Sequence, residues 1–299
     1  MLRIFLLSVF ITALSISPMA AEPPQRPAVT LQVLGSGGPE INDGRSSTGY
    51  LIWVDGKARV LIDLGSGTAH NFEQVGGKLE DLDAILLSHL HVDHCADLPS
   101  FVKALFFADR KAALPILGPE GATWFPSTKE FVERLFAERD SAFPYLSDFL
   151  DPKQASTLHP RSINGNWSQN LGHDIRVECR SITHGSVPAL AWRVEVGDVS
   201  MVFSGDFNGR SGELEVLAKD CDLLICHNAV PESARGLARR LHAPPSVIGR
   251  IAKASGANRL VLSHRMLRTT GIEDETLEHV RASYQGRVDF ADDLSIYEF

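Results

Sequence analysis

The most informative part of the chain is Ala84-Ile85-Leu86-Leu87-Ser88-His89-Leu90-His91-Val92-Asp93-His94. Its first four residues are apolar, which is typical of a buried strand, and three imidazoles and one carboxylate follow within the next seven. Imidazole nitrogens and carboxylate oxygens are the ligands that zinc and related divalent ions take in proteins. A histidine-rich surface turn is the alternative, but a solvated turn gives no reason for the strand before it. The stretch therefore predicts a strand that ends at a metal site.

Three more candidate ligands come directly after apolar, strand-like stretches elsewhere in the chain. They are His184, Asp206 and His264. Strand ends hold side chains rigidly while leaving them open to solvent. Taken singly, each residue could be an ordinary histidine or a capping aspartate. Together with the first cluster they provide five histidines and two aspartates, enough for two metal ions that share a carboxylate.

Strand patterns alternate with helical patterns along the rest of the chain. Strands are expected over 29–34, 48–54, 58–64, 81–88, 177–182, 189–196, 199–204, 222–226 and 259–263, and helices over 69–75, 98–108, 127–138, 245–254 and 273–284. The polar region 139–172 has no clear period, and we interpret His159 and Asn166-Trp167-Ser168 within it as surface features. Such alternation predicts an α/β fold, an αββα sandwich of two mixed sheets packed face to face with helices outside. Ligands in layered folds lie beyond strand ends, where the candidate ligands fall.

The N-terminus differs from the rest of the chain. A short positive start at residues 1–3 precedes an apolar run over 4–16 and a small-residue exit at 17–21. This pattern is typical of a cleaved secretory signal, and the apolar run is too short for a comfortable membrane span, although an uncleaved anchor is the alternative. We therefore expect a signal peptide over 1–21, one hydrolase domain over 22–299, no stable membrane span after leader removal, and a periplasmic or secreted protein.

Composition places the chain among ordinary globular proteins. Its 299 residues are 44% hydrophobic and 22% charged, with a formal net charge of −8. An acidic chain is poorly suited to tight nucleic-acid binding, which normally relies on a basic surface. The four cysteines, Cys95, Cys179, Cys221 and Cys226, are too few for a disulfide scaffold. We expect them to be mainly buried small residues, with one bridge left open if the compartment is oxidising.

The pattern His89-x-His91-x-Asp93-His94, with His184, Asp206 and His264, resembles that of the metallo-β-lactamase superfamily, over nearly the whole chain from residue 35 onward. Finer features resemble its ribonuclease Z and arylsulfatase branch. They are Leu34-Gly35-Ser36-Gly37-Gly38-Pro39, Arg45-Ser46-Ser47, Leu61-Ile62-Asp63-Leu64-Gly65, His184-Gly185-Ser186-Val187-Pro188-Ala189-Leu190 and Leu262-Ser263-His264.

This resemblance implies a binuclear metal centre. His89, His91 and His184 would hold one ion, Asp93, His94 and His264 the other, and Asp206 would bridge the two. Two Zn2+ ions are implied, although the ligand types also admit Mn2+ or Fe2+.

The resemblance also implies catalytic roles. A hydroxide between the metals would be the nucleophile and Asp93 would orient it. His242, in Leu241-His242-Ala243-Pro244-Pro245, resembles the family's histidine that protonates the leaving group. His227 resembles its neighbour in the preceding loop, where a core or supporting role is the alternative to direct catalysis.

Two departures from ribonuclease Z bear on the substrate. Where those enzymes usually carry His-Glu-Ala-Thr, this chain has His227-Asn228-Ala229-Val230, so the expected carboxylate is absent. No glycine- and lysine-rich arm for gripping transfer RNA is found either, because residues 127–140 mix both signs of charge. The leader, the acidity and the missing arm together argue against transfer RNA (tRNA) as a partner.

These observations lead us to expect an exported binuclear zinc hydrolase of a small anionic ester, either a phosphodiester or an organic sulfate, because paired cations polarise such groups. A β-lactamase fits less well, since lactamases place a cysteine or no ligand where this chain has Asp206. A lactonase or carboxylesterase using the same hydroxide is another alternative, as is a non-catalytic metal- or substrate-binding protein. The oligomeric state stays open, with a homodimer among the options.

Overall fold

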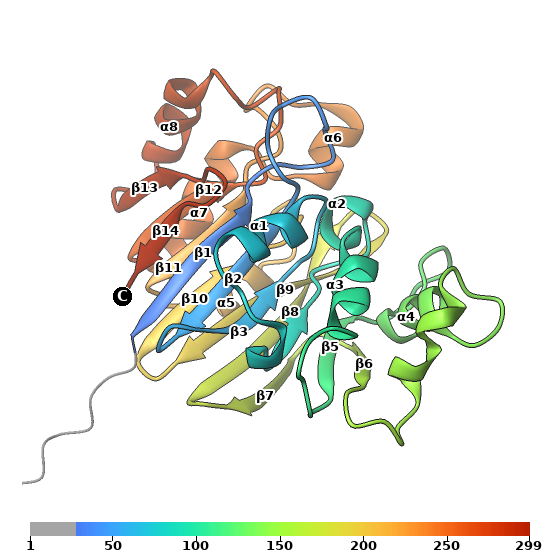
Figure 1. Cartoon of the computed structure of the whole chain (residues 1–299). Helices are drawn as coiled ribbons and strands as arrows, with labels where there is room; N and C mark the ends of the chain where they lie inside the picture. The colour runs from blue at the N-terminus through green and yellow to red at the C-terminus, as the bar shows by residue number, and fades with distance from the viewer. Residues whose placement is uncertain (1–27) are drawn as a thin grey trace, which may run out of the picture.

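The computed structural model describes residues 28–299, so the expected signal peptide over 1–21 lies outside the described residues. Two mixed sheets of seven strands each form the centre of the fold (Figure 1). The first runs in the order β14 (Ile296–Glu298), β1 (Val29–Gly35), β2 (Gly49–Val54), β3 (Lys57–Ile62), β4 (Ala84–Leu86), β5 (Leu114–Pro119) and β6 (Leu158–Ile163). The second runs β13 (Arg287–Phe290), β12 (Arg259–Ser263), β11 (Leu223–His227), β10 (Val199–Phe203), β9 (Val187–Val196), β8 (Ile175–His184) and β7 (Trp167–Gly172).

Helices cover the outer faces of the two sheets. They are α1 (Thr68–Gln74), α2 (Val92–Cys95), α3 (Leu98–Leu105), α4 (Thr128–Phe136), α5 (Glu213–Leu217), α6 (Gly236–Leu241), α7 (Pro245–Ser255) and α8 (Glu273–Arg281), with the short 3-10 turns η1 (Leu79–Asp81) and η2 (Pro144–Leu150). One apolar cluster joins the first sheet to α1, α3 and α4, and another joins the second sheet to α5, α7 and α8. The predicted αββα sandwich is therefore confirmed.

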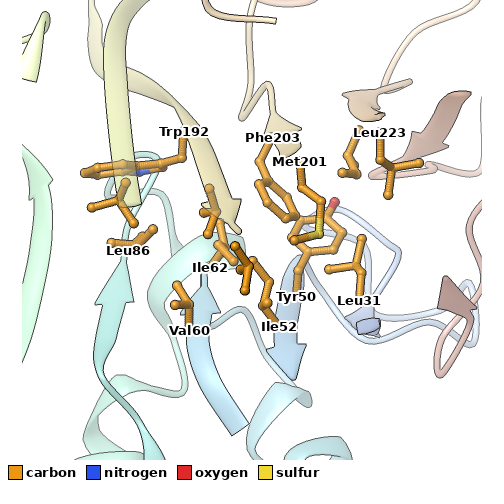
Figure 2. Packing of buried hydrophobic residues seen from close by; sticks show 14 of the residues in the cluster. Leu31, Tyr50, Ile52, Val60, Ile62, Leu86, Trp192, Met201, Phe203 and Leu223 are labelled. Carbon is orange, nitrogen blue, oxygen red and sulfur yellow. The ribbon is translucent and has the colours of Figure 1, made fainter. Parts of the chain in front are cut away.

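The central core lies between the two sheets. Trp192 of β9 packs over Leu86 of β4, and Tyr50 of β2 packs against Phe203 of β10, with ring centroids 5.3 Å apart (Figure 2). The indole nitrogen of Trp192 also donates a hydrogen bond to the carbonyl of Leu87 at 3.0 Å. This contact fixes the end of β4, from which the metal-site stretch continues, against the opposite sheet.

Strand direction explains why the candidate ligands share one edge of the sandwich. Strands β3 to β6 are parallel to one another, and so are β10 to β13. Strand β8 has the same direction as β10, because both are antiparallel to β9. The carboxyl ends of β4, β8, β10, β11 and β12 therefore meet at one end of the molecule, where ligand sites of layered α/β folds are expected.

Several strands and helices were not predicted from the sequence, and the edge strands among them have a physical reason. Strands β6 and β7 lie in the region that was interpreted as polar and irregular, and each is an edge strand of its sheet. Edge strands tolerate polar residues and proline, as in Leu158–Ile163, because one side of the strand has no neighbour. The short elements α5, α6, β13 and β14 were also not predicted. By contrast, the strands expected over 48–54 and 58–64 are present as β2 and β3, and they form a hairpin in which Asp55 and Gly56 both have positive φ.

The four cysteines match the expectation of buried small residues. All are buried, and none is bonded to another. Within residues 28–299, every helix is too short or too polar to cross a bilayer.

Candidate metal centre

The carboxylate of Asp206 lies at the middle of the cluster. Its Oδ2 atom is 3.6 Å from Nε2 of His184 and 3.9 Å from Nε2 of both His89 and His94. Its Oδ1 atom is 3.3 Å from Nε2 of His264. His184 is the last residue of β8, and the other residues follow β4, β10 and β12, so the sandwich brings together side chains that are far apart in the sequence.

Two groups of candidate ligands share Asp206. The first group is His89, His91, His184 and Asp206, and the second is His94, Asp206, His227 and His264; within each group the ligand atoms lie within 4.8 Å of one another. Asp93 lies beside the second group, with Oδ2 3.1 Å from Nε2 of His264 and 3.5 Å from Nε2 of His94. All seven predicted ligands therefore lie together, and Asp206 is placed where a bridging ligand would be.

Unpartnered nitrogens test whether a metal fits this cluster. Nε2 of His94 and Nε2 of His184 are buried and have no hydrogen-bond partner. Nδ1 of His94 lies 2.8 Å from Asp63 Oδ2, and Nδ1 of His184 donates to the carbonyl of Leu241 at 3.0 Å. Each ring is thus anchored through Nδ1 and leaves Nε2 free, the arrangement found around metal-bound histidines. Buried polar atoms without partners are costly, and a bound cation at the centre satisfies both. The donor set therefore fits a metal site.

Asp63 supports the candidate ligand His94, a role that the sequence did not predict. Besides His94, its carboxylate accepts hydrogen bonds from the backbone N–H and the hydroxyl of Ser88, both at 2.7 Å. The only sequence signal was its place at the end of a strand, in Leu61-Ile62-Asp63-Leu64-Gly65. Burial alone would lower the pKa of His94, but Asp93 and Asp63 hold it well above its usual range. Asp63 therefore orients His94 and stabilises positive charge beside it.

His227 lies behind Asp206. Its Nδ1 donates to Asp206 Oδ1 at 2.8 Å, and its Nε2 lies 3.2 Å from the hydroxyl of Tyr50. The Tyr50 hydroxyl is in turn hydrogen-bonded to Ser263 Oγ at 2.8 Å. Burial lowers the pKa of His227 to about 4, so the ring is neutral at pH 7. Because both ring nitrogens are engaged, this geometry suits a residue that fixes the Asp206 carboxylate.

His242 lies at the rim of the cluster, directly after α6. Its Nδ1 is buried without a hydrogen-bond partner and lies 3.8 Å from Asp206 Oδ2. The ring centroid is 5.2 Å from that of His184. Burial lowers the pKa of His242 to about 3. A ring with a free nitrogen at this place can reach a substrate held on the metal centre.

Asn228 stands where a ribonuclease Z-like sequence would carry glutamate. The residue is fully buried, and neither its side-chain nitrogen nor its side-chain oxygen has a hydrogen-bond partner. Asn228 therefore makes no side-chain hydrogen bond that would stand in for the missing glutamate carboxylate.

Comparison with known proteins identifies the class. Residues 58–265 match the family model for the beta-lactamase superfamily domain, which covers more than half of the chain. The chain therefore belongs to this superfamily, and its fold and metal-ligand cluster are those of a metal-dependent hydrolase.

Within that class, curated relatives named Ribonuclease Z cover most of the chain. The protein of Mycobacterium bovis (strain BCG / Pasteur 1173P2) is 26% identical over 283 residues, which is 88% of this chain and 96% of its own length. The protein of Haloferax volcanii is 25% identical and covers 87% of this chain and 92% of its own length.

Solved structures show the same fold. The metallo-beta-lactamase fold protein YhfI from Bacillus subtilis has a TM-score of 0.73 at 21% identity, covering 92% of this chain and 100% of its own. The short form of human tRNase Z has a TM-score of 0.68 at 19% identity, covering 90% of this chain and 98% of its own.

One prediction is corrected by these relatives. The expected function, an exported hydrolase of small anionic esters, is wrong: relatives that cover most of the chain are named Ribonuclease Z, which indicates a nuclease instead. The error has a physical source. Net charge averages over the whole surface, whereas a substrate meets only the surface around the site.

Proposed function

We propose that this protein is a metal-dependent ribonuclease that hydrolyses a phosphodiester bond of RNA. The observation that carries the proposal is the Asp206 carboxylate, which is shared between two groups of candidate ligands, and within each group the ligand atoms lie within 4.8 Å of one another. Two cations that share one carboxylate would suit in-line displacement at phosphorus. The relatives named Ribonuclease Z support RNA as the substrate class.

The residues divide into two metal sites in this proposal. His89, His91 and His184 hold the first ion, His94 and His264 with Asp93 hold the second, and Asp206 is shared. The nitrogen-rich donor set favours zinc, and manganese or iron can bind the same ligands. When bound, the two ions polarise the phosphoryl oxygens and lower the pKa of a water to the neutral range.

In this proposal Asp93 orients the attacking water and His242 donates a proton to the leaving oxygen. Burial would raise the pKa of Asp93, but His94 and His264 hold it below its usual range, so the carboxylate stays ionised and can orient the attacking water. His242 faces the cluster with a free nitrogen and would protonate the leaving oxygen. An anionic phosphate beside this ring raises its pKa, which favours the proton-carrying form only when substrate is bound.

Cleavage of an RNA transcript tests this proposal. The substrate is an RNA hairpin with a single-stranded 3′ extension, and the products are separated by length with and without a chelator. We expect cleavage that the chelator abolishes and zinc restores. Asp206→Asn should lose about 100-fold or more in rate, because the shared ligand is lost. Asp174→Asn is the matched control, since Asp174 is exposed and distant from the cluster. Chelator-resistant cleavage, or intact RNA with zinc-loaded protein, would contradict the proposal.

A further inference from the structure

We propose that α6, its neighbouring loops and part of α7 form a phosphate-binding surface that holds the RNA strand beside the metal centre. This inference rests on the proposed ribonuclease function. The surface, here called the arginine surface, consists of Arg210, Arg235, Arg239, Arg240, Arg250 and Arg268. In this proposal the arginine surface contacts the RNA in place of the glycine- and lysine-rich arm that is missing from residues 127–140.

The arginine surface is fixed to the metal centre by hydrogen bonds. The last carbonyl of α6, that of Leu241, accepts from Nδ1 of the ligand His184 at 3.0 Å. Asn208, two residues after Asp206, donates to the carbonyl of Arg240 at 2.7 Å. Arg239 donates from Nη1 to the carbonyls of Asn208 at 3.1 Å and His242 at 3.3 Å. Helix α6 is therefore hydrogen-bonded to residues of the cluster and their neighbours. It lies at the same end of the molecule as α2 (Figure 1).

These arginines have no acidic partners. Among residues 28–299, none of the six has a carboxylate within ion-pair distance, whereas eight other arginines do: Arg45, Arg59, Arg176, Arg180, Arg193, Arg259, Arg265 and Arg287. All of the six except the half-buried Arg239 are exposed. The guanidinium groups are therefore available to an external anion.

Like charges are concentrated here in an acidic protein. Burial, and after it the positive charge of Arg210, lowers the pKa of Arg239, and Arg250 adds to the effect. The nearby carboxylate of Glu232 offsets this in part, but both of its oxygens already accept hydrogen bonds from Ser246. Arg268 acts on His242 in the same sense, since it lowers the pKa of that ring. A bound polyanion would relieve this repulsion.

A nucleic-acid backbone fits the arginine surface better than a single small anion. Guanidinium groups bind phosphate oxygens with two parallel hydrogen bonds, and six of them on α6 and the segments around it can contact successive phosphates. The attachment to His184, Asn208 and His242 places these contacts next to the scissile bond. The strand that leads into the metal centre would therefore be held by the arginine surface on the α6 side.

The salt dependence of RNA binding tests this inference independently of cleavage. Binding of a fluorescent phosphorothioate RNA hairpin, which keeps the charge of each linkage, is followed by anisotropy between 50 and 200 mM salt with zinc-loaded protein. In Arg210→Ala/Arg240→Ala we expect about 10-fold weaker binding and a salt slope reduced by about 1 for each lost phosphate contact. The matched control is Arg134→Ala/Arg139→Ala, whose arginines are also exposed and unpaired but belong to the 127–140 region. This control should match the wild type.

The outcomes separate the two proposals. Equal affinity and equal salt slope in the α6 variant and the wild type would overturn the arginine surface, as would a larger loss in the Arg134/Arg139 control. Wild-type protein that binds RNA through these arginines but fails to cut it would overturn the ribonuclease proposal and leave the arginine surface standing.

Discussion

Single side chains at the metal centre are fixed by bonds on the side away from the metals. His94 is held by Asp63, His184 by the carbonyl of Leu241, and Asp206 by His227. Such supporting bonds fix both ring direction and tautomer, and they account for much of the affinity of metal sites. The free Nε2 atoms of His94 and His184 lie on the Asp206 side of their rings, so the supporting bonds orient these nitrogens for a metal ion.

Asp63 provides the sharpest test of this support. Asp63→Asn removes the charge that faces His94 while keeping the side-chain shape, and asparagine tolerates the positive φ of 56° at this position. We expect metal affinity to fall by about 10- to 100-fold, measured by competition with a chromogenic chelator. Asp174→Asn is the control, because Asp174 has the same φ of 56° on the surface. Unchanged affinity in Asp63→Asn would show that Asp63 does not support the site.

Substitution of His242 distinguishes a role in proton transfer from a role in metal binding. In His242→Ala we expect turnover of RNA to fall by about 10²- to 10⁴-fold, the usual loss for a proton-transfer group. Metal content should stay complete, because His242 belongs to neither ligand group. Elemental analysis of the purified variant checks this. Loss of metal together with activity would assign His242 to the metal sites instead.

The ligand set was predictable from sequence, but its supports were not. His89, His91, Asp93 and His94 are close together in the chain, and His184, Asp206 and His264 each end an apolar strand. The support of His227 by Tyr50 joins residues 177 positions apart, and no local pattern encodes it. A carboxylate such as Asp63 also looks the same in sequence whether it binds metal or a histidine.

At the scale of elements, β4 and β9 fix the position of the site. The carbonyls of Leu87 and Ser88 accept hydrogen bonds from the indole of Trp192 and the backbone N–H of Leu190. The first residues of the metal-site stretch are thus bonded to the opposite sheet. This arrangement sets the distance between ligands from the two halves of the sandwich.

Trp192→Phe tests that connection. The substitution leaves the buried carbonyl of Leu87 without its indole donor, which costs about 1–3 kcal/mol, and it also removes buried apolar volume. We expect the free energy of unfolding of the zinc-loaded protein to fall by at least that amount in urea titrations. Trp124→Phe is the control, since Trp124 is 85% exposed and its replacement should leave the midpoint unchanged. Equal midpoints for all three proteins would refute the role of Trp192.

Central strands were predictable and edge strands were not. The runs that became β4, β10, β11 and β12 are continuous and apolar because both faces of these strands are covered. In β7, by contrast, residues alternate between exposed and half-buried, and the sequence Trp-Ser-Gln-Asn-Leu-Gly resembles a polar loop. Its strand form depends on pairing with β8, which is a long-range contact.

At the scale of the whole molecule, metal binding and folding should be coupled. The unpartnered imidazole nitrogens of the cluster lie between the carboxyl ends of the two sheets, so a cation bound there favours the folded state. We expect a chelator to lower the melting temperature of the wild type by several degrees. In Asp206→Asn the shift should shrink, since the shared ligand is gone. A wild-type melting temperature that does not respond to chelation would contradict this coupling.

The overall charge shows how a whole-molecule property can mislead. The net charge of −8 argued against RNA, yet the arginines around α6 carry no ion pairs in the described part of the chain. Charge balance in sequence counts every side chain equally, whereas the fold decides which of them surround the site. The same fold places the seven candidate ligands close together, because strand ends are fixed by topology rather than by charge.

Zinc-edge anomalous diffraction from crystals of the zinc-loaded protein would locate each bound zinc ion. We predict two anomalous peaks for each chain, one among His89, His91 and His184 and the other among His94, His264 and Asp93, with Asp206 between them. A single peak, or peaks away from Asp206, would contradict the binuclear centre on which the proposed ribonuclease activity depends.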